Sequence, residues 1–150
     1  GELEMSLFRY IVPLIGLIAF GGPAAAEEKL VFGGDSATPG PAYVLAMMLA
    51  ESGKSELDFV AAEADFNDDG RLDVLAFAMD SYFCGSGGCS PVLYIASKKG
   101  WTEVPFYGLG EAQNWTLLDE KDHGLRRVAY TERGTEYLFG FTGEYYDDLE

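Results

Sequence analysis

The stretch from Asp65 to Cys89 constrains the fold of this chain more than any other. It begins with Asp and Asn side chains at alternate positions, followed by Gly70 at a turn. An apolar segment, 74–79, comes next, and the stretch ends on Cys-Gly-Ser-Gly-Gly-Cys. Alternating oxygen side chains around a glycine are typical of a loop that binds a hard cation. The stretch therefore predicts a cation-type β-hairpin followed by a short loop that a disulfide closes.

The acidic segment supplies a set of oxygen donors at alternate positions, namely Asp65, Asn67, Asp69, the Arg71 carbonyl group and Asp73. This spacing lets several oxygens converge on one cation, and Gly70 permits the sharp turn between them. An EF-hand would also need a bidentate glutamate at the end of its loop, where this chain has Ala76. We therefore expect a Ca²⁺-binding loop between two strands, and not an EF-hand.

Residues 65–73 match the pattern Asp-x-Asp/Asn-x-Asp/Asn-Gly-x-x-Asp throughout. In this they resemble the Ca²⁺-binding hairpins of integrin-type propeller (FG-GAP-like) repeats. A wider resemblance, from Ala64 to Cys89 and again over 141–145, is to small exported bacterial proteins of largely uncharacterised role. The resemblance implies a calcium-stabilised hairpin between two strands. The chain has no convincing second copy of the loop, so we expect one unit and not a propeller array.

The same acidic segment allows an interpretation without metal. Asp and Asn side chains also cap tight turns by accepting hydrogen bonds from backbone N–H groups. The sequence leaves both interpretations open. If Ca²⁺ binds, we expect it to stabilise the hairpin and not to take part in chemistry.

Cys84 and Cys89 enclose four small residues and are the only cysteines. Two cysteines in an exported protein predict one disulfide and not a metal site. A redox-active pair is the alternative, but the two-residue spacing and helix start that lower a thiol pKa are missing. We expect a structural disulfide and a protruding loop that contacts a partner. The expected binding residues are Tyr82, Phe83, Ser86 and Gly87.

The N-terminal segment predicts export. We interpret residues 1–4 as a cloning remnant and residues 5–26 as a signal peptide, with a basic start, an apolar run and Ala24-Ala25-Ala26 before the cleavage point. The apolar run is shorter than the roughly 20 residues of a spanning helix. We therefore expect a periplasmic or secreted protein with no membrane association after signal cleavage. Residues 27–150 suit one domain with one core.

The charge of the chain limits its partners. A net charge of −15 repels nucleic acid and anionic lipid, and the sequence offers no basic patch for binding nucleic acid. The same charge favours encounter with a cationic protein. A solvated acidic surface with no recognition role is an equally open explanation.

The remaining patterns predict one helix followed by strands. Apolar positions between Pro41 and Gly53, including Met47 and Met48, indicate a helix with a core-facing side. The expected strands are 59–64, 72–79, 92–97, 101–106, 115–119, 126–131 and 137–141. The second is apolar on both faces and should be covered on each side. Turn signals at short intervals favour an α+β fold, an antiparallel β-meander sheet with one N-terminal helix packed on it.

Six aromatic residues could form either a recognition face or the core, and we favour the core: Tyr82, Phe83, Trp101, Phe106, Tyr107 and Trp115. Catalysis has little support. His123, the only histidine, lies in a polar turn, and Ser86 lacks the strand–turn–helix setting of a hydrolase nucleophile.

We therefore expect a non-enzymatic exported binding protein. Its charge, size and compartment suit an inhibitor or immunity-type protein against a cationic cell-envelope hydrolase. The alternatives are a calcium-stabilised structural or adhesion module and a hydrolase.

Overall fold

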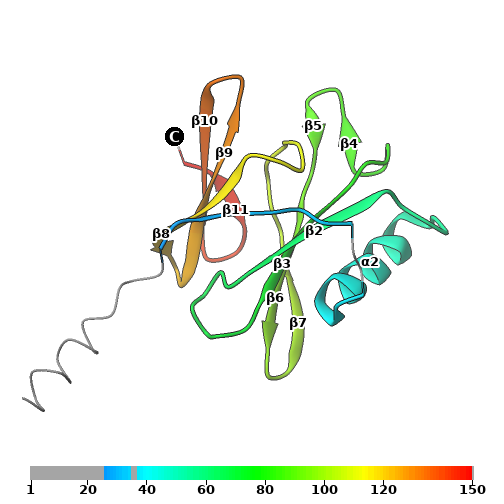
Figure 1. Cartoon of the computed structure of the whole chain (residues 1–150), viewed down its shortest axis with the longest axis horizontal. Helices are drawn as coiled ribbons and strands as arrows, with labels where there is room; N and C mark the ends of the chain where they lie inside the picture. The colour runs from blue at the N-terminus through cyan, green and yellow to red at the C-terminus, as the bar shows by residue number, and fades with distance from the viewer. Residues whose placement is uncertain (1–25, 35–36, 150) are drawn as a thin grey trace, which may run out of the picture.

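The computed structural model describes residues 26–34 and 37–149, so the expected cloning remnant and the leader up to residue 25 lie outside the described residues. The described residues form mostly antiparallel β-structure with one helix, α2 (Pro39–Ser52) (Figure 1). No helix among the described residues has the length and apolar character needed to cross a membrane.

The strands form two main sheets and one small hairpin. The five-stranded sheet has the order β1 (Glu28–Lys29), β8 (Trp115–Asp122), β9 (Leu125–Glu132), β10 (Thr135–Phe141) and β11 (Tyr146–Asp148). The four-stranded sheet has the order β2 (Phe59–Ala64), β3 (Asp73–Ala78), β6 (Val92–Ser97) and β7 (Gly100–Val104). The separate hairpin pairs β4 (Cys84–Gly85) with β5 (Gly88–Cys89).

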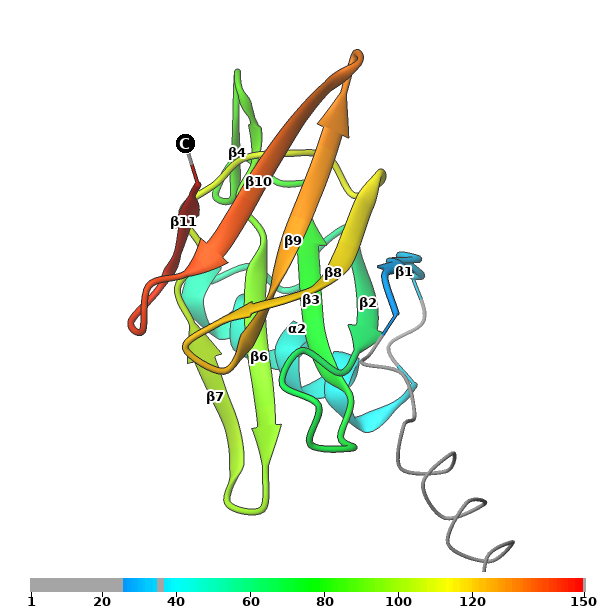
Figure 2. The same ribbon diagram turned by 90° about the vertical axis from the view of Figure 1, so that its left-hand side faces the viewer.

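The expected α+β fold with a single meander sheet is wrong. The strands divide between two sheets: β2, β3, β6 and β7 form one, whereas β8 to β11 form the other together with the N-terminal β1. The four-stranded sheet lies between α2 and the five-stranded sheet, which gives three layers (Figures 1 and 2). Turn spacing could not reveal this division, because the hydrogen-bond partner of a strand is not encoded in the strand's own pattern.

Strand β3 lies in the middle layer and contributes side chains to the core on each side of it. All of its residues are buried, as expected for a strand covered on both faces. Leu75 and Phe77 pack into the core between the two sheets, whereas Val74 and Ala76 pack into the core beneath α2. Successive side chains of a strand point to opposite faces, so one apolar strand supplies both cores.

Helix α2 begins before Pro41 and ends at Gly53, whose φ of 72° suits a glycine that caps a helix C-terminus. Val44 and Met48 are buried against the four-stranded sheet. Met47 is 40% exposed, so its expected place in the core is wrong. The apolar residues of this segment extend around more of the helix than the face that contacts the sheet. Met47 lies outside that face.

Arg126 links the five-stranded sheet to the loop before β3. Its backbone N–H donates to the Phe66 carbonyl group at 2.9 Å. Its buried guanidinium donates to the carbonyl groups of Leu118, Asp65 and Ala26. A buried charge is costly unless it is hydrogen-bonded, and these carbonyl groups satisfy it.

Candidate functional site

The acidic hairpin, residues 65–72 between β2 and β3, is closed mainly by Asp65. One carboxylate oxygen of Asp65 accepts from the backbone N–H groups of Asn67 and Asp69 at 3.3 and 3.2 Å. The other accepts from Gly70 N–H at 2.8 Å. Gly70 has a φ of 84°, as the turn requires. The expected hairpin between two antiparallel strands is therefore confirmed.

The structure brings Asp65, Asn67 and Asp69 together. One terminal atom of the Asn67 amide lies 3.0 Å from Asp65 Oδ1 and 2.9 Å from Asp69 Oδ1. If that atom is nitrogen, the amide donates to both carboxylates and closes the turn without metal. If it is oxygen, three oxygens face one another, and a cation between them would offset their repulsion.

Arg71 also contacts Asp69, through both its backbone and its side chain. Its backbone N–H donates to Asp69 Oδ1 at 2.9 Å, and its guanidinium lies 3.4 Å from Asp69 Oδ2. The backbone hydrogen bond from Arg71 is the main cause that lowers the pKa of Asp69. Asp69 is therefore ionised at neutral pH.

Asp73 is completely buried and points away from solvent. Its two oxygens accept from the backbone N–H groups of Phe66 and Ala96, each at 2.8 Å. Burial raises the pKa of Asp73 to about 6 against the opposing effect of these hydrogen bonds, and the charges of Asp69 and Asp65 contribute to the rise. Asp73 thus joins the acidic hairpin to β6.

Within the described part of the chain, no group of three or more His, Cys, Asp or Glu side chains is arranged to hold a metal ion. The donors that fit Ca²⁺ best are the Asp65 and Asp69 carboxylates and the Asn67 amide. Binding of Ca²⁺ to the expected ligands stays a prediction.

The stapled hairpin, β4 and β5 with their turn, is closed by a Cys84–Cys89 disulfide, which confirms the expected pairing. Its base is fixed a second time, because Cys89 and Gly110 exchange backbone hydrogen bonds at 2.9 and 3.0 Å. A Cβ atom on Gly88 would lie 3.1 Å from Gly110 N and 3.2 Å from its carbonyl oxygen. Only a glycine allows this close approach, so the hairpin is held firmly against the linker between β7 and β8.

The expected binding residues divide between surface and core. Ser86 and Gly87 form the exposed turn of the stapled hairpin, and Tyr82 is 52% exposed beside it. Phe83 is 8% exposed and packs in the core beneath α2. Of the other aromatic residues, Phe106 and Trp115 are core and Tyr107 is exposed.

The acidic hairpin and the stapled hairpin lie at opposite ends of β3 (Figures 1 and 2). The acidic hairpin precedes Asp73, and the stapled hairpin follows Ala78 after a short turn. The two features are adjacent in the sequence but separate in space.

Large apolar side chains are exposed around the stapled hairpin, namely Met79, Tyr82, Tyr107, Leu109 and Tyr137. Two pockets flank the hairpin. One, of about 410 Å³, is lined by Gly85, Gly88 and Cys89 together with Met79 and residues 110–113. The other, which we call the tyrosine pocket, has a volume of about 300 Å³.

The tyrosine pocket is lined by residues from the stapled hairpin, the linker, β9, β10 and β11: Gly87, Tyr107, Gly108, Leu109, Tyr130, Glu132, Tyr137, Phe139 and Asp148. Of these, the sequence had indicated only Gly87 and Tyr107 as candidates. Tyr130, Glu132 and Tyr137 carry no local motif, and no signal in the sequence identifies them as neighbours of the stapled hairpin.

Comparison with protein-family models, with curated proteins and with solved structures finds no match for this chain. The resemblance of residues 65–73 to FG-GAP-like hairpins, and that of residues 64–89 and 141–145 to small exported bacterial proteins, therefore stay predictions.

Proposed function

We propose that this chain is a non-enzymatic exported binding protein, periplasmic or secreted, that docks on a cationic protein. Its partner is a cell-envelope hydrolase, and its action is that of an inhibitor or immunity-type protein. The observation that carries the proposal is the stapled hairpin, which is held at both ends and surrounded by exposed apolar side chains.

A preformed hairpin favours binding, because little conformational freedom is lost when a partner orders it. Exposed aromatic side chains such as Tyr82 and Tyr107 supply large contact areas with few rotatable bonds. The net charge of −15 would speed encounter with a basic enzyme. Together these properties suit a rigid projection that enters the active-site cleft of a cationic hydrolase.

The test uses purified basic peptidoglycan hydrolases, a lysozyme and an amidase, and measures both binding and clearing of a cell-wall suspension. We expect at least one enzyme to bind and to lose activity in proportion to occupancy. Gly87→Trp should weaken this binding, since a Cβ atom on Gly87 points towards Leu109 Cδ1 at 3.1 Å and a larger side chain would change the contact surface.

Gly85→Trp is the matched control for overall folding, because a Cβ atom on Gly85 meets nothing within 4 Å. The proposal is wrong if none of the basic hydrolases is bound or inhibited. A hydrolase that binds both variants as well as the parent protein would place its contact away from the stapled hairpin.

We also propose, as a second candidate, that Ca²⁺ stabilises the acidic hairpin, so that the chain could serve as a structural or adhesion module. The observation that favours it is the convergence of the Asp65, Asn67 and Asp69 side chains. Under this proposal the cation acts on stability, at the end of the molecule opposite the stapled hairpin.

A further inference from the structure

The tyrosine pocket is the open end of the core between the two sheets. Tyr130 lies opposite Tyr137 in the β9–β10 register, and Phe139 lies opposite Asp148 in the β10–β11 register. Residues two apart on one strand share a face, so these four side chains and Glu132 project from one face of the five-stranded sheet. At the end of β9 and the start of β10, this face extends beyond the core and is exposed to solvent.

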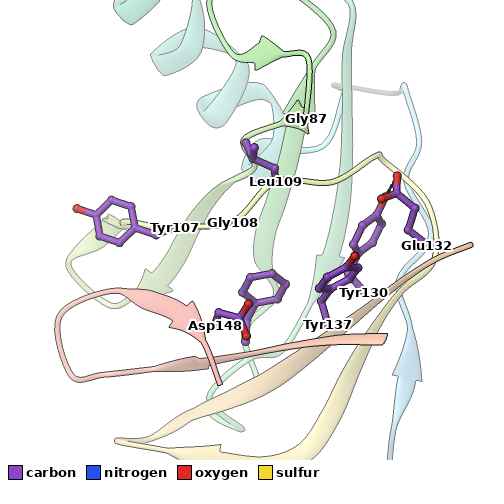
Figure 3. Close-up of a pocket in the computed structure, with 9 residues that line it drawn as sticks. Gly87, Tyr107, Gly108, Leu109, Tyr130, Glu132, Tyr137 and Asp148 are labelled. Atoms are coloured by element: carbon purple, nitrogen blue, oxygen red, sulfur yellow. Dashed lines mark hydrogen bonds between the residues drawn. The ribbon is translucent and has the colours of Figure 1, made fainter. Parts of the chain in front are cut away.

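The walls of the pocket combine aromatic rings with carboxylates. The Tyr130 and Tyr137 rings are stacked, with centroids 6.2 Å apart and an interplanar angle of 26°. The Tyr130 hydroxyl group lies 3.4 Å from Glu132 Oε1 (Figure 3). Figure 3 shows Asp148 across the pocket from this cluster, with Leu109 and Gly87 above. The exposed Tyr137 ring and the two carboxylates therefore line one small volume.

The pocket has negative charge but no cation of its own. Its lining contains Glu132 and Asp148 and no Lys or Arg. Neither carboxylate is in an ion pair with a described residue. The Tyr130 ring is buried and stacked between Trp115 and Tyr137, so the ring that offers an open π-face to the pocket is that of Tyr137, which is 37% exposed. A cation over an aromatic face and beside a carboxylate is stabilised by both.

We propose that the tyrosine pocket receives an arginine side chain of the partner. A guanidinium is planar, stacks on aromatic rings and forms forked hydrogen bonds with carboxylates, which matches this combination of walls. The inference rests on the proposed function, because it names the chemistry by which a cationic protein would be recognised beside the stapled hairpin. Gly87 lines the pocket, so the hairpin itself forms part of the binding site.

The experiment is an NMR titration of the ¹⁵N-labelled protein with N-acetyl-arginine amide. N-acetyl-citrulline amide, a neutral molecule of nearly the same shape, is the control ligand. We expect saturable shifts at residues 87, 107–109, 130–139 and 148 with a Kd on the order of 1–10 mM, as a single side chain allows. The citrulline derivative should bind several-fold more weakly.

Asp148→Asn and Asp147→Asn form a matched pair, because they remove the same charge from adjacent positions on opposite faces of β11. Asp148→Asn should weaken arginine binding about fivefold, the effect of losing one partly exposed charge pair. Asp147→Asn should leave it nearly unchanged. Gly87→Trp should abolish it, and the spectrum itself reports whether each variant is folded.

Equal binding of the citrulline derivative, or equal effects of Asp147→Asn and Asp148→Asn, would overturn the inference. The titration uses no partner protein, so its failure is distinguishable from failure of the proposed function. If arginine binds but no basic hydrolase does, the pocket stands and the proposed partner is wrong. If a hydrolase binds but Asp148→Asn leaves its affinity unchanged, only the pocket assignment fails.

Discussion

Asp73 is the residue on which the acidic hairpin and the four-stranded sheet both depend. Its buried carboxyl accepts backbone hydrogen bonds from Phe66 and Ala96, which lie on either side of it in space. Burial raises the pKa of this carboxyl to about 6, above its ordinary value of 3.8. The folded protein therefore holds the Asp73 proton more tightly than the unfolded chain does. The stabilisation that this proton provides is complete below the ordinary pKa and is lost as the pH rises through about 6.

We predict that Asp73→Asn removes this pH dependence. The quantity to compare is the unfolding free energy of the parent protein minus that of the variant, measured in a chelating buffer. This difference should be about 2 kcal/mol greater near pH 4.5 than near pH 7.5. Urea unfolding at both pH values measures it. Asp119→Asn, at an exposed position on β8, is the control for the loss of one negative charge. A difference that is independent of pH would show that Asp73 has an ordinary pKa.

A second prediction concerns the candidate calcium ligands one by one. Calorimetry on chelator-treated protein should detect Ca²⁺ binding at millimolar concentration or below, and Asp69→Asn should weaken it about tenfold or more. Asp68→Asn, in the same loop, is the charge-matched control, because the Asp68 carboxylate points to Lys121 and not to Asn67. Absence of binding heat in the parent protein would leave only the metal-free capped turn.

Among the elements, the stapled hairpin is unusual because it belongs to neither main sheet. The Cys84–Cys89 disulfide closes it, and the bonds to Gly110 attach it to the linker. The linker in turn packs on the core, since a Cβ atom on Gly110 would lie 2.7 Å from the Trp115 ring. The hairpin is therefore rigid through its base, while its turn stays free for contact.

We predict that Gly88→Ala destabilises the protein by about 1–3 kcal/mol, because Gly88 has a φ of 125° and approaches the Gly110 backbone closely. Gly85→Ala, in the same hairpin but facing open space, should change the unfolding free energy by less than about 0.5 kcal/mol. Denaturant unfolding under non-reducing conditions compares the two. Equal stability of the two variants would show that the hairpin is not docked on the linker.

At the scale of the whole molecule, the two candidate sites lie at opposite ends of an acidic body. The two proposals are therefore independent, because calcium binding at the acidic hairpin does not require a partner and partner binding at the stapled hairpin does not require a metal. Under both proposals the net charge of −15 would contribute, by attracting Ca²⁺ in one and by steering a basic protein in the other. Steering affects encounter from a distance, whereas the lifetime of the complex depends on contacts that have already formed.

We therefore predict that raising the salt concentration from about 0.05 to 0.5 M slows association with a basic hydrolase about tenfold and changes dissociation about twofold or less. Surface-binding kinetics at several salt concentrations measure both rates. Glu136→Lys, on an exposed position of β10, should reduce the salt dependence of association. A salt effect confined to dissociation would instead indicate that short-range ion pairs hold the complex together.

The sequence by itself determined the local features of this protein. The acidic hairpin, the disulfide, the helix between Pro41 and Gly53 and the strand buried on both faces each depend on residues that are neighbours along the chain. Local turn chemistry and side-chain alternation report such features directly.

Only the tertiary structure decided how these elements combine. Alternation shows that a strand has a buried face but not what covers it, so the division into two sheets was not predictable. The same holds for Met47, whose exposure depends on where α2 meets the sheet. The tyrosine pocket draws on residues between 87 and 148, and these meet only because the linker carries the chain from one sheet to the other.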